Sequence, residues 1–512
     1  MSLLSRLFTT LTESSSLASS SLIAATQKTH ARILKSGAPI ERQQLVQRYC
    51  DADAFRYACQ LFDEVPNWDL FSSTAIISSF SRRNRHRDAI FLFSLTLRRN
   101  LRPNQFTFGA VLPSVTALHD LAAGKQLHSS LLKMGLQSDV FAGSSLLDHY
   151  AKLGNLEETR RAFDEICEPN VVSYTALLFG YLKNSLSGEA LRIFCRMPEK
   201  TVVSWNAMIS GFNQMGLIEE CIKLFVEMNR EGIFPNIFTF PSVLSAAADI
   251  PAIAIGRSFH AFIIKVLPKL NVYVGNSLII FYSKCGCLQD GLLVFENLDE
   301  KNIVSWNAVI YGYAQNGNGE AAIKFFKRMK SNGLKPNGFS ILGLLFGCSH
   351  SGLVDEGLEY FKRFVEEEPG LVMPEHCASV VDLLSRSGRI AEAEKFLNEL
   401  PFDPGIGFWK SALGGCQIHS KRDFAVVFAR RILELDPEEA SSFVLLSNVQ
   451  SSAGNWQDVA RVRTKMEDKS MKRVPGSSWI EVQGKIHDFF NGDRRHSQAD
   501  EIYFVLGVLH HS

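Results

Sequence analysis

Short polar side chains recur at one position of otherwise apolar segments, and their chemistry suits hydrogen bonding to a partner. They are Thr74, Ser144, Thr175, Asn206, Asn276 and Asn307. Ser and Asn are poor helix formers because their side chains compete for backbone hydrogen bonds, so a purely structural helix would not favour them. The sequence contains no Gly-rich phosphate loop, nucleophile elbow or metal-ligand cluster. We therefore expect recognition rather than catalysis, with no catalytic residue, no metal and no cofactor.

A sequence repeat positions these side chains. Residues 204–209 read Ser-Trp-Asn-Ala-Met-Ile, residues 305–310 read Ser-Trp-Asn-Ala-Val-Ile, and residues 173–178 form a looser copy. Repeat starts spaced by 31, 35 or 36 residues fall at Pro39, Leu70, Gln105, Val140, Val171, Val202, Ile237, Val272, Ile303, Gly338 and Pro374. The polar residues occupy the fifth position of their repeats. Periods of this length indicate a solenoid with one extended surface.

Each repeat is predicted to form two antiparallel helices. In residues 202–236, apolar residues follow helical spacing, Gly216 interrupts the pattern, and Gly232 and Pro235 end it. One hairpin cannot bury its apolar face alone, so neighbouring repeats must stack. We expect Trp205 and Trp306 in the core. The predicted fold class is all-α, a right-handed α-solenoid superhelix of helix–turn–helix repeats.

Composition excludes several classes of partner. Lys plus Arg number 54 and Asp plus Glu 53, which argues against a partner held mainly by bulk electrostatics. No apolar run reaches the about 18 residues of a membrane span, so no membrane partner is expected. Residues 1–28 are rich in Ser and Thr with Glu13 as their one acid, which is typical of an organellar transit peptide. Their amphipathic opening favours the mitochondrion, with the chloroplast as the alternative.

The register resembles that of the pentatricopeptide repeat family, and specifically its plant subclass with alternating repeats of about 35, 35 and 31 residues. The resemblance is carried by motifs such as Leu-Arg-Pro-Asn at 101–104, Leu-Lys-Pro-Asn at 334–337 and Tyr-Ser-Lys-Cys-Gly at 282–286. It implies that each repeat binds one base of single-stranded RNA. The fifth residue would contact the base edge, the last residue would adjust that contact, and the second residue would wedge between bases.

These implied roles fall on defined residues of this chain. The base-reading pairs are Thr74 with Asn104, Ser144 with Asn170, Thr175 with Thr201, Asn206 with Asn236, Asn276 with Asn302, and Asn307 with Asn337. The base-sandwiching residues are Phe71, Phe141, Val172, Val203, Tyr273 and Val304, with Phe106, Phe238 and Phe339 at the same position. Two alternatives remain open: the last-position Asn residues are also preferred helix N-caps, and the second-position residues could be ordinary packing between repeats.

Family preferences assign bases to these pairs. The first two pairs should prefer adenine, the three Asn–Asn pairs pyrimidines, and the base for Thr175 with Thr201 is undetermined. Gly109, Pro241 and Leu342 at position five, and Ala378 with Gly405 in the last repeat, offer little side-chain readout. With the RNA 5′ end at the N-terminal repeats, the expected target reads A-x-A-x-Y-x-Y-Y.

The C-terminal tail resembles that of plant organellar RNA-editing factors. Two 34-residue units are followed by Pro-Gly-Ser-Ser-Trp-Ile-Glu-Val at 475–482 and Gly-Asp-Arg at 492–494, similar to the E and E+ motifs. A cytidine deaminase needs His-x-Glu and Cys-x-x-Cys for its zinc site, and neither pattern occurs. We expect no DYW deaminase domain and no enzyme activity. A DYW-type deaminase and accessory editing factors would bind in trans through the tail.

The resulting division of the chain is a transit peptide at 1–28, a partial repeat at 29–38, eleven repeats at 39–405, two tetratricopeptide-like E motifs at 406–473, and an E+ extension at 474–512. The leading function is a single-stranded RNA-binding adaptor that selects cytidines for C-to-U editing of organellar transcripts. The alternatives are a factor for organellar splicing or transcript-end stabilisation, and a helical protein–protein scaffold.

Overall fold

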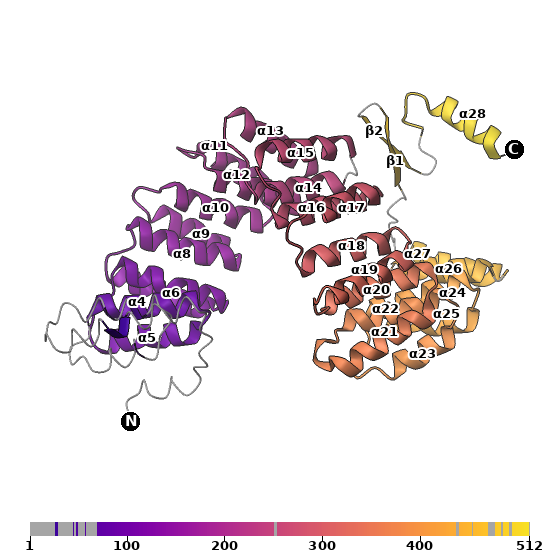
Figure 1. Ribbon diagram of the computed structural model, residues 1–512, viewed down its shortest axis with the longest axis horizontal. Helices are drawn as coiled ribbons and strands as arrows, with labels where there is room; N and C mark the ends of the chain where they lie inside the picture. The colour runs from indigo at the N-terminus through magenta and orange to yellow at the C-terminus, as the bar shows by residue number, and fades with distance from the viewer. Residues whose placement is uncertain are drawn as a thin grey trace. The chain divides into compact units, whose positions relative to one another are not determined.

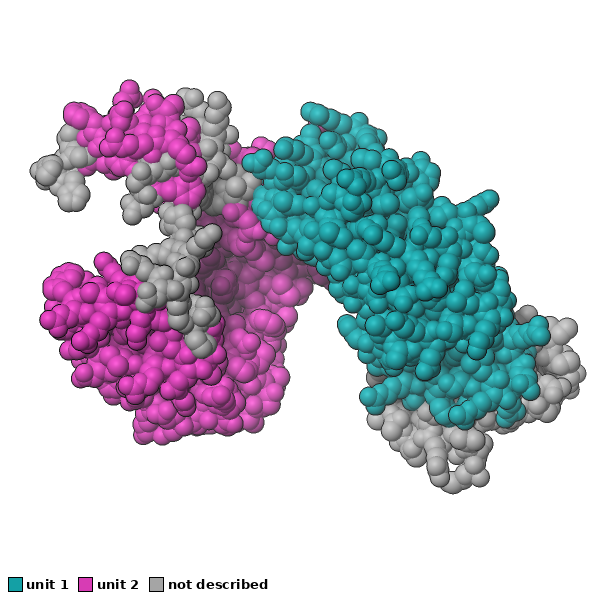
Figure 2. All heavy atoms as spheres, turned by 180° about the vertical axis from the view of Figure 1, so that it is seen from behind, with its two compact units in different colours: residues 1–236 teal, residues 237–512 magenta. Residues whose placement is uncertain are grey.

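The computed structural model describes residues 26–28, 45, 48–49, 57, 69–249, 253–436, 440–452, 454–468, 477–482, 485–490 and 494–510. The expected partial repeat at 29–38 lies outside these residues, as does the expected transit peptide apart from residues 26–28. The chain forms two compact units, residues 1–236 and 237–512 (Figure 2).

Unit 1 consists of helical hairpins stacked in chain order (Figure 1). The first helices of its repeats are α4 (Leu70–Arg82), α6 (Gln105–Ala117), α8 (Val140–Leu153), α10 (Val171–Lys183) and α12 (Val202–Gln214). The second helices are α5 (His86–Arg98), α7 (Leu121–Lys133), α9 (Leu156–Asp164), α11 (Ser187–Arg196) and α13 (Ile218–Arg230). Each first helix packs against its own second helix and against the first helix of the next repeat. The first helices therefore form a continuous layer within the unit.

Unit 2 continues this pattern and ends in a different element. Its first helices are α14 (Thr239–Asp249), α16 (Val272–Lys284), α18 (Ile303–Gln315), α20 (Gly338–Ser351), α22 (Pro374–Arg386), α24 (Ile406–Ile418) and α26 (Ala440–Ser452). Its second helices are α15 (Ile253–Val266), α17 (Leu288–Glu296), α19 (Gly319–Ser331), α21 (Val354–Glu367), α23 (Ile390–Asn398), α25 (Arg422–Leu435) and α27 (Trp456–Asp468). The short 3-10 helix η2 (Pro369–Leu371) precedes α22. The predicted α-solenoid is confirmed.

Local sequence explains where the helices begin and end. The first helices begin at the repeat starts read from the sequence, except that α14 begins at Thr239, after a turn at 237–238, instead of at Ile237. Gly154 and Gly352 end α8 and α20 with φ of 76° and 71°, a left-handed conformation in which glycine avoids the steric cost of a Cβ atom. Because these helices begin at the repeat starts, the polar residues at position five stand at the fifth residue of successive first helices.

Large aromatic side chains hold the hairpins together. Trp205 and Trp306 are 1% and 2% exposed, as predicted for core residues. Their rings lie edge-on to Phe194 and Phe295, with centroids 4.7 Å and 4.9 Å apart. Such tilted pairs are the favoured geometry of packed aromatic rings. The tryptophans therefore join the second helix of one repeat to the first helix of the next.

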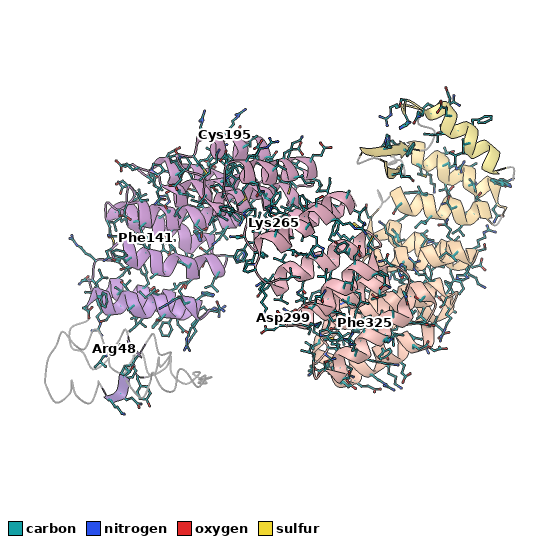
Figure 3. All side chains as sticks on the ribbon, turned by 45° about the horizontal axis from the view of Figure 1, so that its top comes forward. Arg48, Phe141, Cys195, Lys265, Asp299 and Phe325 are labelled. Carbon is teal, nitrogen blue, oxygen red and sulfur yellow. The ribbon has the colours of Figure 1, made fainter. Side chains whose placement is uncertain are left out.

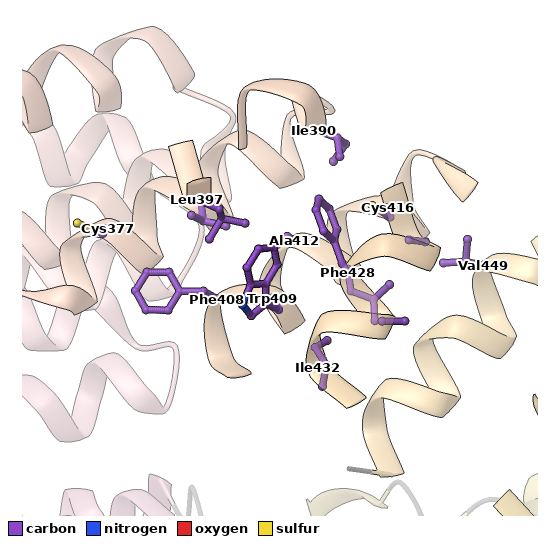
Figure 4. Close-up of a cluster of buried hydrophobic side chains, with 14 residues drawn as sticks. Cys377, Ile390, Leu397, Phe408, Trp409, Ala412, Cys416, Phe428, Ile432 and Val449 are labelled. Atoms are coloured by element: carbon purple, nitrogen blue, oxygen red, sulfur yellow. The ribbon is translucent and has the colours of Figure 1, made fainter. Parts of the chain in front are cut away.

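The hydrophobic core runs from the last repeat into the tail. Cys377 of α22, Trp409 of α24, Phe428 of α25 and Val449 of α26 belong to one buried cluster (Figure 4). The helices of the tail thus extend the solenoid rather than forming a separate core. Among the described residues, no helix has the length and apolar character required to cross a membrane.

The end of unit 2 contains an element that the sequence did not lead us to expect. Strands β1 (Ser477–Val482) and β2 (Lys485–Phe490) pair antiparallel, with Trp479 opposite Asp488, and α28 (Ala499–His510) follows. The expectation of an all-helical chain therefore holds for the solenoid, and the tail adds this two-stranded sheet.

Candidate nucleic-acid interface

The last residue of a repeat caps the first helix of the next repeat. Asn104 Oδ1 accepts from the backbone N–H of Thr107 at 3.1 Å, and Asn337 Oδ1 accepts from that of Ser340 at 3.0 Å. Asn170, Thr201 and Asn302 cap α10, α12 and α18 in the same way. The N-cap alternative is therefore true of these residues, because their side chains satisfy N–H groups that a helix leaves unpaired. Capping does not exclude a second role, since each amide also carries an NH₂ group.

The three Asn–Asn pairs are brought into direct contact. Nδ2 of the fifth residue donates to Oδ1 of the last residue in each: Asn206 to Asn236 at 3.1 Å, Asn276 to Asn302 at 3.4 Å, and Asn307 to Asn337 at 3.1 Å. The residues of each pair are far apart in sequence. Their meeting supports a shared role, because capping alone would not require the fifth residue.

The Thr–Asn and Ser–Asn pairs are joined indirectly through a hydroxyl group. Thr74 Oγ1 lies 2.8 Å from Thr107 Oγ1, which donates to Asn104 Oδ1 at 3.0 Å. Ser144 Oγ lies 2.7 Å from Ser173 Oγ, which donates to Asn170 Oδ1 at 3.3 Å. The two pairs assigned to adenine therefore share a geometry that differs from that of the pairs assigned to pyrimidines.

Thr175 and Thr201 are not joined by a hydrogen bond within the described structure. The Thr175 hydroxyl donates to the carbonyl oxygen of Val171 in its own helix at 2.7 Å. The Thr201 side chain instead accepts from the backbone N–H of Ser204 at 3.4 Å. This repeat therefore presents no coupled pair, in keeping with its unassigned base.

The base-reading residues differ in how far solvent can reach them. Ser144 and Asn276 are buried, at 6% and 5% exposed. Thr74, Thr175, Asn206 and Asn307 are partly exposed. Asn276 Oδ1 is fully enclosed and has no hydrogen-bond partner. A base placed against Ser144 or Asn276 would need a small outward movement of these side chains.

The second-position residues form an exposed apolar series, although Phe106 and Phe141 also contact each other between repeats. The exposed fraction lies between 50% for Val304 and 70% for Phe238. The series comprises Phe71, Phe106, Phe141, Val172, Val203, Phe238, Tyr273, Val304 and Phe339. Apart from Phe238, which lies in the turn before α14, each stands in its first helix three residues before position five, so both positions face the same side of that helix. Regularly spaced apolar groups left in water mark a binding surface.

One repeat shows why its fifth position is glycine. A Cβ atom on Gly109 would lie 2.3 Å from Cε1 of Phe141, the second residue of the following repeat. Phe141, labelled in Figure 3, lies at the start of α8, and its ring is 5.5 Å from that of Phe106. The aromatic ring thus takes the space that a reading side chain uses elsewhere. At its fifth position this repeat has no side chain that can form a hydrogen bond with a base.

Metal and thiol chemistry receive no support from the described residues. They contain no group of three or more His, Cys, Asp and Glu side chains that could hold a metal ion. Burial raises the pKa of the Cys221, Cys348 and Cys416 thiols to about 12, so these side chains stay protonated and unreactive near neutral pH.

Comparison with known proteins identifies the family. Models described as "PPR repeat family" match residues 200–249 and 301–350, and "PPR repeat" models match 172–202, 276–303 and 343–368. A mitochondrial pentatricopeptide repeat-containing protein of Arabidopsis thaliana is 48% identical over 486 residues, which cover 94% of each chain. The chain belongs to the pentatricopeptide repeat family. A second mitochondrial relative from the same plant is 35% identical over 91% of this chain and 68% of its own length.

The comparisons also bear on the tail and the location of this pentatricopeptide repeat protein. A model described as "E motif" matches residues 419–481, which include α25, α26, α27 and most of β1. The mitochondrial names of the relatives confirm the predicted mitochondrial location. The crystal structure of the maize pentatricopeptide repeat protein PPR10 is 17% identical, covers 90% of this chain and 84% of its own, and has a TM-score of 0.43.

The hydroxyl groups that link the reading pairs were not singled out from the sequence. Thr107, Ser173 and Ser340 are all fully buried at the third position of their repeats. A signal for them was present, because a hydroxyl residue stands at this position only in certain repeats. The role of these hydroxyl groups becomes apparent only from their contacts with the reading pairs.

Proposed function

We propose that this chain is a sequence-specific single-stranded RNA-binding adaptor that selects cytidines for C-to-U editing of mitochondrial transcripts. The observation that carries the proposal is the repeated pairing of a fifth residue with the last residue of its repeat, beside an exposed apolar residue at position two. One polar pair and one apolar wedge per repeat match the needs of one RNA base: an edge to hydrogen-bond and a face to stack against.

The pair Asn307 with Asn337 presents hydrogen-bond donors. Asn337 Oδ1 already accepts from Asn307 Nδ2 and from the Ser340 backbone N–H, and it lies 3.0 Å from Ser340 Oγ. Its own Nδ2 group and the second proton of Asn307 Nδ2 stay available, because an amide nitrogen carries two protons. A cytosine would meet these donors with its O2 and N3 acceptors, whereas uracil carries a proton on N3. The geometry therefore supports pyrimidine recognition with cytosine ahead of uracil.

The exposed second-position residues supply affinity for RNA that a nearly neutral protein cannot gain from electrostatic attraction. The net charge is +1, so counterion release contributes little compared with a basic RNA-binding protein. Stacking of a base on an aromatic side chain contributes about 1–3 kcal/mol. Tyr273 and Phe71, which are 65% and 60% exposed, are suited to this contact. Several such residues in series explain how a nearly neutral surface can bind a strand.

The tail is proposed to recruit a DYW-type deaminase and accessory editing factors in trans. The E-motif match supports a recruiting role, since a passive RNA roadblock needs no such segment. Apolar side chains stand exposed there: Ile480 on β1, and Tyr503, Phe504, Val505 and Leu506 on α28. Exposed apolar side chains of this kind mark surfaces that bind other proteins. Deamination itself is assigned to the partner.

Sequencing of mitochondrial transcripts from plants with and without this gene tests the proposal. We expect one or a few cytidines, each preceded by A-x-A-x-Y-x-Y-Y, to lose conversion to uridine when the gene is absent. The wild-type gene should restore editing, and a variant lacking residues 474–512 should bind the same RNA without restoring it. Intact editing with unspliced or shortened transcripts would replace the editing function by the splicing or end-stabilisation alternative.

A further inference from the structure

We infer that the buried hydroxyl residue at position three of the following repeat, where it contacts the fifth residue as Thr107, Ser173 and Ser340 do, is a positioning residue that fixes the hydrogen-bonding orientation of the preceding base-reading pair. This rests on the proposed function, and it adds a third determinant of base selectivity. The residue does not touch RNA, because it is buried beneath the pair. It acts through the fifth and last residues that it contacts.

The first observation is a pattern within the chain. A hydroxyl residue at position three follows each polar fifth residue: Thr107 after Thr74, Ser173 after Ser144, Ser204 after Thr175, Thr239 after Asn206, Ser305 after Asn276, and Ser340 after Asn307. Where the fifth residue is Gly109 or Pro241, the following third residue is Ala142 or Val274. After Leu342 and Ala378 it is His376 and Phe408. A hydroxyl residue at position three therefore follows a polar fifth residue and does not follow Gly109, Pro241, Leu342 or Ala378.

Helix capping explains only part of this pattern, although Thr107, Ser204, Ser305 and Ser340 form reciprocal caps with the preceding N-cap residues. Asp139 caps α8 by accepting from the backbone N–H of Ala142 at 2.8 Å, although position three there carries no hydroxyl. Asn271 likewise caps α16, where position three is Val274. A first helix can therefore begin well without a hydroxyl at this place. Thr107, Ser173 and Ser340 contact the preceding fifth residue, whereas Ser204 does not, and Ser305 bonds to Asn302 and leaves Asn276 Oδ1 without a partner.

The geometry at Ser340 shows what the hydroxyl does. Ser340 Oγ is fully buried, and it donates to Asn307 Oδ1 at 2.6 Å. Because Asn337 Oδ1 lies 3.0 Å away and accepts two other N–H groups, the single hydroxyl proton is best placed on Asn307. Asn307 is thereby held with its oxygen toward Ser340 and its nitrogen toward Asn337. Without the hydroxyl, its amide could rotate by half a turn and present an acceptor in place of a donor.

The same arrangement recurs in unit 1. Thr107 Oγ1 stands between Thr74 Oγ1 at 2.8 Å and Asn104 Oδ1 at 3.0 Å. Ser173 Oγ stands between Ser144 Oγ at 2.7 Å and Asn170 Oδ1 at 3.3 Å. Each bridging hydroxyl decides whether the reading hydroxyl donates inward or outward, since its own proton can serve one acceptor at a time. The bridge therefore sets the hydrogen-bonding character offered to the base.

Ser204 provides a matched control. It is fully buried, and it forms the same reciprocal cap as Ser340, with the Thr201 N–H donating to Ser204 Oγ at 3.0 Å. The Thr175 hydroxyl, however, turns to the carbonyl oxygen of Val171, so Ser204 contacts Thr201 but no fifth-position residue. Ser204→Ala and Ser340→Ala thus remove equivalent caps, and only the second removes a contact to a fifth-position residue.

The test measures dissociation constants of the full chain for four RNAs that differ only at the base assigned to Asn307 with Asn337. We expect Ser340→Ala to reduce the preference for pyrimidines, and for cytosine over uracil, by about 5-fold, the equivalent of one net hydrogen bond. Ser340→Thr keeps the hydroxyl and should retain the wild-type ratio. Ser204→Ala should retain it as well, at a thermal stability equal to that of Ser340→Ala.

Three results would overturn the inference. Unchanged selectivity in Ser340→Ala, while Asn337→Asp alters it, would remove the positioning role and leave the RNA-reading function in place. Equal loss in Ser204→Ala and Ser340→Ala would assign the effect to a general loss of helix stability and not to the contact with Asn307. A wild-type chain without any base preference at this position would refute the reading function itself, and the positioning role with it.

Discussion

Replacing Asn337 by Asp should convert a cytosine-preferring repeat into one that prefers uracil. The Asn337 side chain uses Oδ1 for three contacts, to the Ser340 N–H, the Ser340 hydroxyl and Asn307 Nδ2. Aspartate keeps that oxygen and is an equally good N-cap, so α20 should stay intact. The available NH₂ group becomes a carboxylate oxygen. A donor thus turns into an acceptor at one place, which suits the N3 proton of uracil and repels N3 of cytosine.

The size of the shift follows from one exchanged hydrogen bond. Leaving a polar group unpaired costs about 1–3 kcal/mol. Because the substitution penalises cytosine and favours uracil together, we expect the uracil-to-cytosine affinity ratio to rise by about 10-fold or more. The added negative charge should weaken binding to every RNA, and therefore the ratio is the informative quantity. Fluorescence anisotropy with two RNAs that differ at this base measures it.

Two controls show whether the effect of Asn337→Asp is confined to one base and does not arise from unfolding. Its thermal midpoint should match that of the wild type, and its preference at the base assigned to Ser144 with Asn170 should not change. An unaltered uracil-to-cytosine ratio in a folded variant would refute the assignment of this pair to base reading. A shift toward a purine would refute the proposed donor geometry.

Three further changes separate packing, stacking and protonation. Trp306→Ala should lower the free energy of unfolding by about 3–5 kcal/mol, because it empties a buried aromatic site, and denaturant titration checks this. Tyr273→Ala should weaken RNA binding by about 10-fold, because the exposed ring can stack on a base. Its stability should hardly change, since the ring is 65% exposed. A stability loss equal to that of Trp306→Ala would contradict the placement of Tyr273 on the surface. Burial lowers the pKa of His149, with Asp148 and Asp120 acting in the opposite direction. The folded chain therefore binds fewer protons than the unfolded chain, and its free energy of unfolding should fall as the pH drops below the ordinary value of 6.5. Urea unfolding at pH 7.5 and 5.5 should show this fall, and a smaller one in His149→Gln.

The helical register could be predicted because the sequence repeats its own packing residues. Trp205 and Trp306 stand in nearly identical sequence motifs, so the helix boundaries assigned to one hairpin could be applied to the other repeats. The turn before α14 was not foreseen, and the tail sheet was not either, since its residues belong to no repeat. The boundaries assigned to the transit peptide, repeats and tail remain predictions.

The candidate site was only partly predictable. Position in the repeat marked Asn307 and Asn337 as candidates, but they lie 30 residues apart in the sequence, and their direct contact needs coordinates. Second-position residues such as Tyr273 have the same apolar character as core residues, and their exposure distinguishes them. The inward turn of the Thr175 hydroxyl depends on a side-chain rotamer that composition does not specify.

Selection from a random pool of single-stranded RNA by the purified full chain tests the central claim most directly. The reading pairs predict enrichment of A-x-A-x-Y-x-Y-Y in this 5′-to-3′ order, with free choice at the positions facing Gly109 and Pro241. Enrichment of an unrelated sequence, or no enrichment over the starting pool, would contradict the claim that these paired side chains read RNA.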